Sequence, residues 1–276
     1  MGVLILYNSN INKYEVMRLK KESKRYVNIK FLDVMKLDIP FDLELFRDYK
    51  VVFFYTRTLG RDSYILASEL EGIGKIVINK NFGVFQHLDK TLMYMILSKH
   101  GVRIPKFVKI YNIKSIRGVL KLGFPLVVKH VSKHRGTHVR LIKSKEELKT
   151  FVRNAKRKIS SYLFQEYIDY NYDLRVIFIG NNVVGVMKRV ISGDFRANIS
   201  RGGVGSCFEI DNKIKEITML VARSLKMQVG SIDILIDKNG NYYVIDAHNI
   251  FQFKGFERYT KINVANEIIK YLKSLI

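Results

Sequence analysis

Cysteine, acidic residues and long hydrophobic runs are all scarce in this sequence of 276 residues. The single cysteine, Cys207, excludes an intramolecular disulfide and a zinc site made of several cysteines, as is typical of proteins in a reducing compartment. No apolar run approaches the roughly 18 residues that a membrane-spanning helix needs. The apolar stretch at residues 3–7 is too short for the core of a signal peptide. We therefore expect a soluble, cytoplasmic protein that does not contact membranes.

Basic residues greatly outnumber acidic ones. The chain has 48 Lys and Arg against 25 Asp and Glu, a formal net charge of +23. Residues 103–158 hold 17 Lys and Arg but only two acids, Glu146 and Glu147. A positive surface attracts nucleic acids, phosphate-bearing cofactors and acidic substrates, although a lysine-rich surface that contacts only solvent fits the charge equally well. The sequence contains no zinc-finger spacing, aromatic RNA-binding strand motif or heptad repeat that would favour nucleic acid.

The composition is that of a folded protein, since 47% of residues are hydrophobic and 26% are charged. In residues 1–80, short apolar strands alternate with helices, and this alternation predicts parallel βαβ units. The strands are expected at residues 3–7, 27–32, 51–55 and 75–78, and the helices at residues 13–25 and 63–70.

A mixed pattern follows this first third. A longer helix is expected at residues 85–99, because apolar residues recur there at helical spacing and Gly101 ends the pattern. Short strands, hairpins and further helices continue from there to a C-terminal helix at residues 262–275. We expect an α/β (α+β) fold with an N-terminal βαβ domain. The expected division is residues 1–80 for that domain, and residues 81–168 and 169–276 for two α+β subdomains.

The most informative stretch is residues 231–248, where Asn239 and Gly240 separate two β-rich runs. Asn-Gly is the strongest short signal for a hairpin with a type I′ turn, because that turn needs positive φ at both central residues. If these two residues form the turn, the register places Asp233 directly opposite Asp246.

The same register predicts which side chains share a face of the hairpin. One face is expected to pack on the core and carries Ile232, Ile234, Ile236, Tyr243, Ile245 and Ala247. The other carries Ser231, Asp233, Leu235, Val244, Asp246 and His248. Two carboxylates about 5 Å apart repel each other unless a cation lies between them, and Mg²⁺ prefers such oxygen ligands. A pair of solvated aspartates is the alternative that this pairing leaves open.

The segment at residues 194–203 is a second candidate site. Two arginines, an asparagine and two glycines follow an expected strand there, a combination that can hold an anionic group. A glycine-rich surface turn is the alternative. Cys207, just beyond, is expected to be a small buried residue without an activated thiol, because no His or Lys adjoins it.

Five sequence blocks in this order resemble the ATP-grasp superfamily, specifically the RimK-like glutamate ligases. The blocks lie at residues 123–129, 165–168, 173–175, 193–203 and 231–235. The string Asp-Phe-Arg-x-Asn-x-x-Arg-Gly-Gly is the most specific of them, and Asp89-Lys90 also resembles the family's Asp-Lys element. The resemblance covers most of the chain and implies the ATP-grasp fold, with the βαβ domain preceding two ATP-grasp subdomains.

The resemblance also implies which residues bind the nucleotide. Lys90 and Lys129 would contact the phosphates of ATP. Glu166 and Tyr167 would form the hinge against adenine, and Asp173 would hold the ribose.

A second set of residues is implied to act at the reacting groups. Arg196 and Asn198 would line the phosphate and metal region, with Arg201 near the acyl phosphate, so that Arg196 and Arg201 are the expected catalytic residues. Asp233 and Asp246 would ligate Mg²⁺, which agrees with the pair that the hairpin register brings together.

Three features depart from the family pattern. The family usually has Glu at the position of Asp246 and Asn two residues later, where this chain has His248. Histidine suits Mn²⁺ or Zn²⁺ better than Mg²⁺, so the third metal ligand is either His248 or Asn249, and Mn²⁺ is an alternative metal. The phosphate-covering segment 132–138 keeps one glycine where the family has several. Residues 249–254 replace the family's small-residue and proline turn, so we expect an acceptor pocket specific to this chain.

The resemblance therefore implies an ATP-dependent carboxylate–amine ligase that joins an amino acid, glutamate in the family, to a carboxylate acceptor. The net charge favours an anionic small molecule or an acidic peptide as acceptor. Two other hypotheses stay open. One is a basic RNA- or ribosome-associated protein, and the other a nucleotide-binding module with impaired chemistry. A homo-oligomer is also expected.

Overall fold

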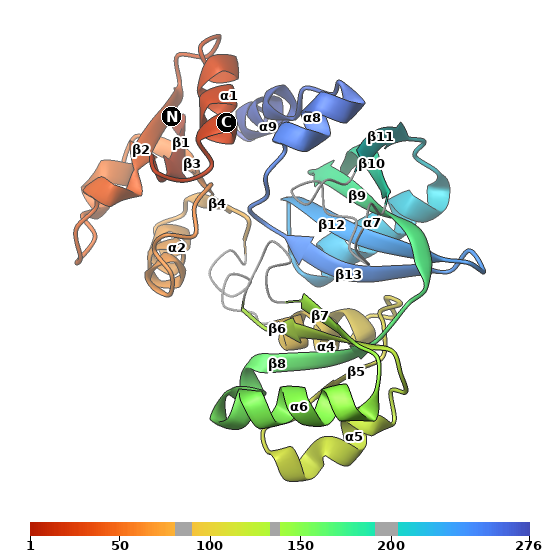
Figure 1. Cartoon of the computed structure of the whole chain (residues 1–276). Coiled ribbons are helices and arrows are strands. Elements are labelled where there is room, and N and C mark those ends of the chain that lie inside the picture. The colour runs from red at the N-terminus through yellow and green to blue at the C-terminus, as the bar shows by residue number, and fades with distance from the viewer. Residues whose placement is uncertain (81–89, 133–138, 191–203) are drawn as a thin grey trace.

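Three β-sheets organise the chain, in a computed structural model that describes residues 1–80, 90–132, 139–190 and 204–276 (Figure 1). In chain order we call them the N-terminal, central and C-terminal sheets. Their strand orders are β2-β1-β3-β4, β5-β8-β6-β7 and β11-β10-β9-β12-β13. Figure 1 shows the chain passing from one sheet to the next and returning to the first through its last two helices.

The N-terminal sheet is fully parallel, which confirms the βαβ pattern. Its elements are β1 (Gly2–Tyr7), α1 (Lys13–Ser23), β2 (Ile29–Asp33), β3 (Tyr49–Phe54), α2 (Asp62–Gly72) and β4 (Ile76–Ile78). Alternate residues of β1 enter different cores: Val3 and Ile5 pack with Leu19 of α1, whereas Leu4 packs with Leu66 of α2. Burial on both faces explains why these strands are continuous apolar runs.

The central sheet is antiparallel and is covered by short helices. Its elements are α4 (Lys90–Lys99), β5 (Phe107–Lys109), α5 (Ile116–Leu120), β6 (Leu126–His130), β7 (Val139–Ile142), α6 (Lys145–Ala155) and β8 (Tyr162–Glu166). Ser144 begins α6 because its side chain accepts a hydrogen bond from the Glu147 amide, a standard N-cap. The first residues of the helix expected at 85–99 lie outside the described residues.

The C-terminal sheet consists of antiparallel strands, and helix α7 packs against it. Its elements are β9 (Tyr170–Ile179), β10 (Asn182–Val190), β11 (Val204–Phe208), α7 (Asn212–Ser224), β12 (Val229–Asp237) and β13 (Tyr242–His248). The prediction that Cys207 is buried is wrong, because this residue lies on β11, an edge strand, and its side chain is exposed. An edge strand has a neighbour on only one side, so its residues are less covered.

The last two helices return to the first sheet. Helices α8 (Lys254–Thr260) and α9 (Val264–Lys273) lie beside α1 in Figure 1. Ile268 and Leu272 of α9 belong to the same core as Val3 and Ile5. The C-terminal end of the chain thus completes the N-terminal core, and the division at residues 80 and 168 stays a prediction about domains.

The hairpin of β12 and β13 pairs Asp233 with Asp246, as the sequence predicts, but through a different turn. Gly240 has a φ of 75°, whereas Asn239 does not adopt positive φ, so the turn is not type I′. Backbone hydrogen bonds instead close a three-residue loop, residues 238–240. The register then shifts by one residue just beyond Asp233. This β-bulge offsets the longer loop, which is why the predicted pairing is right.

The bulge also makes part of the predicted face pattern wrong. Val244 is 1% exposed and shares a core with Ile234, although the sequence placed it on the opposite face. Tyr243 and Ile245 pack with Leu235 instead. Side chains in a strand point to opposite faces in turn, so one inserted residue exchanges the two faces for the residues of β13 between the loop and the bulge.

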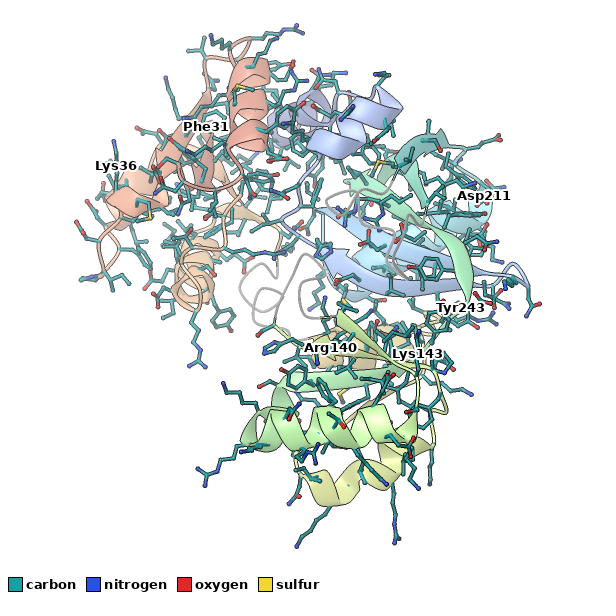
Figure 2. The ribbon with its side chains drawn as sticks, in the orientation of Figure 1. Phe31, Lys36, Arg140, Lys143, Asp211 and Tyr243 are labelled. Carbon is teal, nitrogen blue, oxygen red and sulfur yellow. The ribbon has the colours of Figure 1, made fainter. Side chains whose placement is uncertain are left out.

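The excess positive charge of residues 103–132 and 139–158 lies mostly on the surface. Among the described Lys and Arg of this segment, Lys129 is buried and Lys109 is half-buried, and the others are exposed. Arg140 and Lys143 project from the edge of the central sheet in Figure 2. Within the described ranges, no helix has the length and apolarity to cross a membrane.

Candidate functional site

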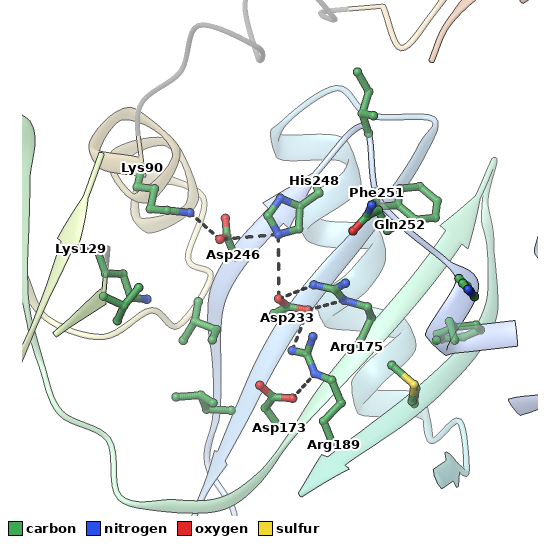
Figure 3. A pocket seen from close by; sticks show the side chains of 18 of the residues that line it. Lys90, Lys129, Asp173, Arg175, Arg189, Asp233, Asp246, His248, Phe251 and Gln252 are labelled. Carbon is green, nitrogen blue, oxygen red and sulfur yellow. Dashed lines mark hydrogen bonds and ion pairs between the residues drawn. The ribbon is translucent and has the colours of Figure 1, made fainter. Parts of the chain in front are cut away.

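A cavity of about 690 Å³ lies where the three sheets approach one another. The central sheet contributes Val127, Lys129 and Gln165, and the start of α4 contributes Lys90. The C-terminal sheet supplies the three aspartates of the described lining, and a third wall comes from α1 and from residues 250–256. Figure 3 shows Lys90 and Lys129 on one side of a row of acids and arginines, with Lys90 in contact with Asp246.

Asp233 is the centre of that row. Arg175 of β9 lies directly opposite Asp233 of β12, and Asp246 of β13 lies opposite on the other side, so three charged residues form one line across the sheet. Arg175 binds both oxygens of Asp233, with Nε–Oδ1 and Nη2–Oδ2 distances of 2.9 Å. Arg189 adds a third contact, Nη2 to Oδ1 at 3.0 Å. Burial opposes ionisation of Asp233, but Arg175 and Arg189 outweigh it and hold its pKa well below the usual range.

Asp173 and Arg189 form a neighbouring cross-strand pair. They lie directly opposite each other on β9 and β10, and Arg189 Nε donates to Asp173 Oδ1 at 2.5 Å. Both are buried, at 2% and 3% exposure. Asp173, which the resemblance assigns to the ribose, lines the cavity and is held in place by this arginine.

Asp246 binds the ammonium group of Lys90. The Nζ–Oδ2 distance is 2.5 Å, and the imidazole Nε2 of His248 lies 3.6 Å from the same oxygen. Burial lowers the pKa of His248 to about 4, so this side chain is neutral at pH 7. Burial opposes ionisation of Asp246, but His248 and Lys90 pull its pKa well below the usual range, and at neutral pH it is Lys90 that supplies the positive charge.

Lys129 is a buried cation of a different kind. It is 9% exposed, and among the described carboxylates none forms an ion pair with it. Its Nζ donates to the Tyr94 hydroxyl at 3.5 Å, and that hydroxyl lies 3.0 Å from both Gln165 Oε1 and the Ile245 carbonyl oxygen. Burial, together with the nearby charge of Lys90, lowers the pKa of Lys129 to about 8. A buried ammonium with no acid to neutralise it is suited to bind an anion.

The remaining predicted residues are placed as follows. Tyr167 lines the cavity, whereas Glu166 uses its carboxylate to accept a hydrogen bond from the Lys106 amide at 2.7 Å. Arg196, Asn198 and Arg201 lie outside the described residues.

Two arginines and one tyrosine of the site were not assigned roles from the sequence. Arg175 and Arg189 are distant in sequence from Asp233 and reach it only through strand pairing. Tyr94, which connects α4 to the central and C-terminal sheets, was not singled out from the sequence. The alternation of charge across β9, β10 and β12 would have been the signal, but it requires the register of three strands.

The donor set fits a magnesium–nucleotide complex better than an all-protein metal site. Mg²⁺ is usually held by one or two carboxylates together with substrate phosphates and water, and Asp233 and Asp246 supply two facing carboxylates. In the part of the chain that the structure describes, no group of three or more His, Cys, Asp or Glu is arranged to hold a metal ion. Asn249 is buried, and neither of its side-chain polar atoms is hydrogen-bonded to a described residue. His248 lines the cavity among the described residues, and Asn249 does not.

The fold and this cavity define the class of protein. Solved structures with the same fold are ATP-grasp ligases. The ligase PsnB, complexed with a minimal precursor, matches the whole chain with a TM-score of 0.74 at 16% identity and full coverage of both chains. The D-alanine–D-alanine ligase of Bacillus anthracis matches with a TM-score of 0.72 at 17% identity, covering 99% of this chain and 96% of its own.

The chain belongs to the RimK-like ATP-grasp family, whose domain profile matches residues 87–272. The glutamate–LysW ligase ArgX of Sulfolobus acidocaldarius is 30% identical over 271 residues, or 96% of this chain and 95% of that protein. Human β-citrylglutamate synthase B is 31% identical over 219 residues, or 75% of this chain but only 55% of that protein. The chain is thus an ATP-dependent carboxylate–amine ligase that forms carbon–nitrogen bonds.

Proposed function

We propose that this ligase joins glutamate, through its amine, to a carboxylate of an anionic acceptor by way of an acyl phosphate. The observation that carries the proposal is the cavity in which buried Lys90 and Lys129 face the Asp233–Asp246 pair. The relatives support glutamate, because ArgX is a glutamate–LysW ligase and a protein of Coxiella burnetii is a probable α-L-glutamate ligase at 27% identity.

The proposed reaction has two steps, formation of an acyl phosphate and its reaction with the amine. A carboxylate oxygen of the acceptor attacks the γ-phosphorus of ATP, the bond to the β-phosphate oxygen breaks, and ADP leaves. The amine of glutamate then attacks the acyl carbon, loses a proton, and displaces inorganic phosphate, which keeps the acceptor's oxygen. Lys90 and Lys129 hold and neutralise the phosphates in both steps, and such preorganised positive charge is the main contribution that a site of this kind makes.

A metal ion and the other residues that the family resemblance implies complete the proposed site. Asp233 and Asp246, with His248 beside them, would hold Mg²⁺, or Mn²⁺ as an alternative, which supplies further charge neutralisation at the phosphates. Tyr167 and Glu166 at the hinge, Asp173 at the ribose, Asn198 in the phosphate region, and catalytic Arg196 and Arg201 stay proposals from the family resemblance.

The charge of the cavity supports an anionic acceptor. Among the described residues, seven Lys and Arg line it against four Asp and Glu. Asp233, Asp246 and Asp173 already bind basic side chains, and Glu15 accepts backbone hydrogen bonds. Lys13, Arg57 and Lys254 also line the cavity, so a polycarboxylate would meet further positive charge there.

A second function is favoured by a separate observation, the exposed basic surface of residues 103–132 and 139–158. An RNA- or ribosome-associated role would use this surface and would show binding that weakens steeply with salt. Salt-dependent RNA binding with no acceptor-dependent ADP release would support that alternative.

The test of the ligase proposal is ADP release with ATP, MgCl₂, glutamate and a panel of acceptors. Citrate, N-acetylaspartate and a peptide ending in glutamate suit the panel, the first two being suggested by the names of the relatives. We expect ADP release to need both glutamate and one acceptor, with mass spectrometry showing a glutamylated product. ADP release that depends on neither glutamate nor the acceptor would contradict the proposal. So would the absence of ADP release with every acceptor of the panel.

The pKa of Lys129 makes nucleotide affinity depend on pH. The free protein keeps Lys129 charged below its pKa of about 8, and bound phosphates favour the charged form, so binding takes up a proton above that pH. We expect the affinity for ATP to be constant up to about pH 8 and then to fall by up to roughly tenfold per pH unit. Calorimetric titration at several pH values checks this, with Lys129→Met as the control that should lose the inflection. A flat profile in the unaltered protein would contradict the role of Lys129.

A further inference from the structure

The segment between β13 and α8 forms one wall of the cavity without regular secondary structure of its own. Ile250, Phe251 and Gln252 line the cavity, and Lys254 continues the wall at the start of α8. In Figure 3, Phe251 and Gln252 lie beyond His248, on the far side of the acidic pair from Lys129.

Three side chains from the N-terminal part of the chain hold the backbone of this wall. The Tyr55 hydroxyl donates to the Phe251 carbonyl oxygen at 2.6 Å, and Arg57 Nη2 donates to the Ile250 carbonyl oxygen at 3.1 Å. Glu15 Oε1 accepts from the amides of Phe253 and Lys254 at 3.0 and 3.2 Å. Every one of these bonds goes to the main chain, so they fix where the wall runs whatever side chains it carries.

Two of the three side chains that hold the wall are buried, so their polar groups have lost contact with water. Tyr55 is 1% exposed and Glu15 is 2% exposed. Burial raises the pKa of Glu15 even though backbone amides stabilise its carboxylate. A buried carboxylate that accepts hydrogen bonds from two successive amides of one short segment orders that segment at the expense of its own hydration.

Building on the proposed ligase function, we propose that Tyr55, Arg57 and Glu15 are positioning residues that set the affinity for the acceptor by fixing the wall at residues 250–254. The nucleotide is bound on the other side of the cavity, by Lys90 and Lys129. The N-terminal part of the chain therefore controls the acceptor's KM, whereas the affinity for ATP is independent of it.

Tyr55→Phe is the most direct test, because it removes one hydroxyl and keeps the buried ring. We expect the KM for the acceptor that supports turnover to rise roughly 5- to 10-fold, the value of one lost hydrogen bond, with the KM for ATP nearly unchanged. The control is Tyr64→Phe, which removes a hydroxyl from a half-exposed tyrosine on α2 and should change neither constant. Equal changes in both KM values, or none in Tyr55→Phe, would overturn the proposal.

Glu15 gives a second readout that does not need turnover. Glu15→Gln keeps Oε1 as an acceptor, whereas Glu15→Ala removes it. Hydrogen exchange of the Phe253 and Lys254 amides should therefore accelerate by about tenfold or more in Glu15→Ala and stay close to normal in Glu15→Gln. Exchange that is equal in all three proteins would show that Glu15 does not hold the wall. The exchange rates could behave as expected while no acceptor supports ADP release. In that case the ligase proposal and the acceptor role are both wrong, but Glu15 still orders the wall.

Discussion

Replacing Lys129 with Met should weaken ATP binding by roughly 100-fold, the value of a buried charged contact to phosphate, while leaving the free protein as stable as before or more so. The reason is that Lys129 is buried without a described carboxylate partner, and burial lowers its pKa to about 8. Its charge therefore opposes folding at neutral pH, where the unfolded chain keeps the group charged at no cost. Met has a similar shape and no charge.

Calorimetry with ATP and thermal unfolding without it measure the two halves of this prediction. Lys99→Met, at the exposed end of α4, is the matched control and should affect neither quantity. A Lys129→Met protein that binds ATP normally would remove Lys129 from the nucleotide site. One that unfolds much more easily would show that its ammonium group stabilises the fold instead.

Asp233→Asn should have the largest effect on stability, lowering the free energy of unfolding by roughly 3–5 kcal/mol at pH 7. Asparagine keeps the volume of Asp233 but removes the charge that neutralises Arg175 and Arg189. The pKa of Asp233 in the folded protein lies well below its unfolded value near 4, so the stabilisation is fully present above about pH 4 and is lost as the pH falls below it. Urea unfolding of both proteins across this range should show their stabilities converging in acid.

Asp169→Asn is the matched control for this experiment. Asp169 also binds a basic side chain, Lys238, at 2.6 Å, but both partners are more than half exposed. Solvent screens such a pair, so the same substitution there should leave the urea midpoint unchanged. Equal effects of the two substitutions, or an Asp233→Asn protein as stable as the unaltered one, would contradict the view that the row across β9 and β12 stabilises the sheet.

Local patterns in the sequence predict most of the fold, because each uses nearby residues. The parallel order of the first sheet follows from alternating strands and helices, and the opposed pair Asp233 and Asp246 follows from one hairpin. Even there, the loop is one residue longer than expected and a bulge in β13 compensates, an outcome that pairing rules cannot reveal.

The parts of the site that the sequence did not predict depend on contacts across long sequence separations. Arg175 and Arg189 reach Asp233 only because β10, β9 and β12 are neighbours in one sheet. The wall at residues 250–254 is hydrogen-bonded by side chains that lie between 193 and 239 positions earlier in the sequence. Such contacts are set by how the sheets meet, and no periodicity along the chain records them.

The most direct test of the ligase account is the fate of an oxygen-18 label in the acceptor's carboxylate during turnover. The acceptor used is whichever member of the panel supports ADP release, and the phosphate released is analysed by mass spectrometry. The account predicts that one labelled oxygen passes from each acceptor molecule into inorganic phosphate, because the carboxylate attacks the γ-phosphorus and the amine later displaces the phosphate. Label that stays entirely in the acceptor and product while ADP is formed would contradict activation of the carboxylate by phosphorylation.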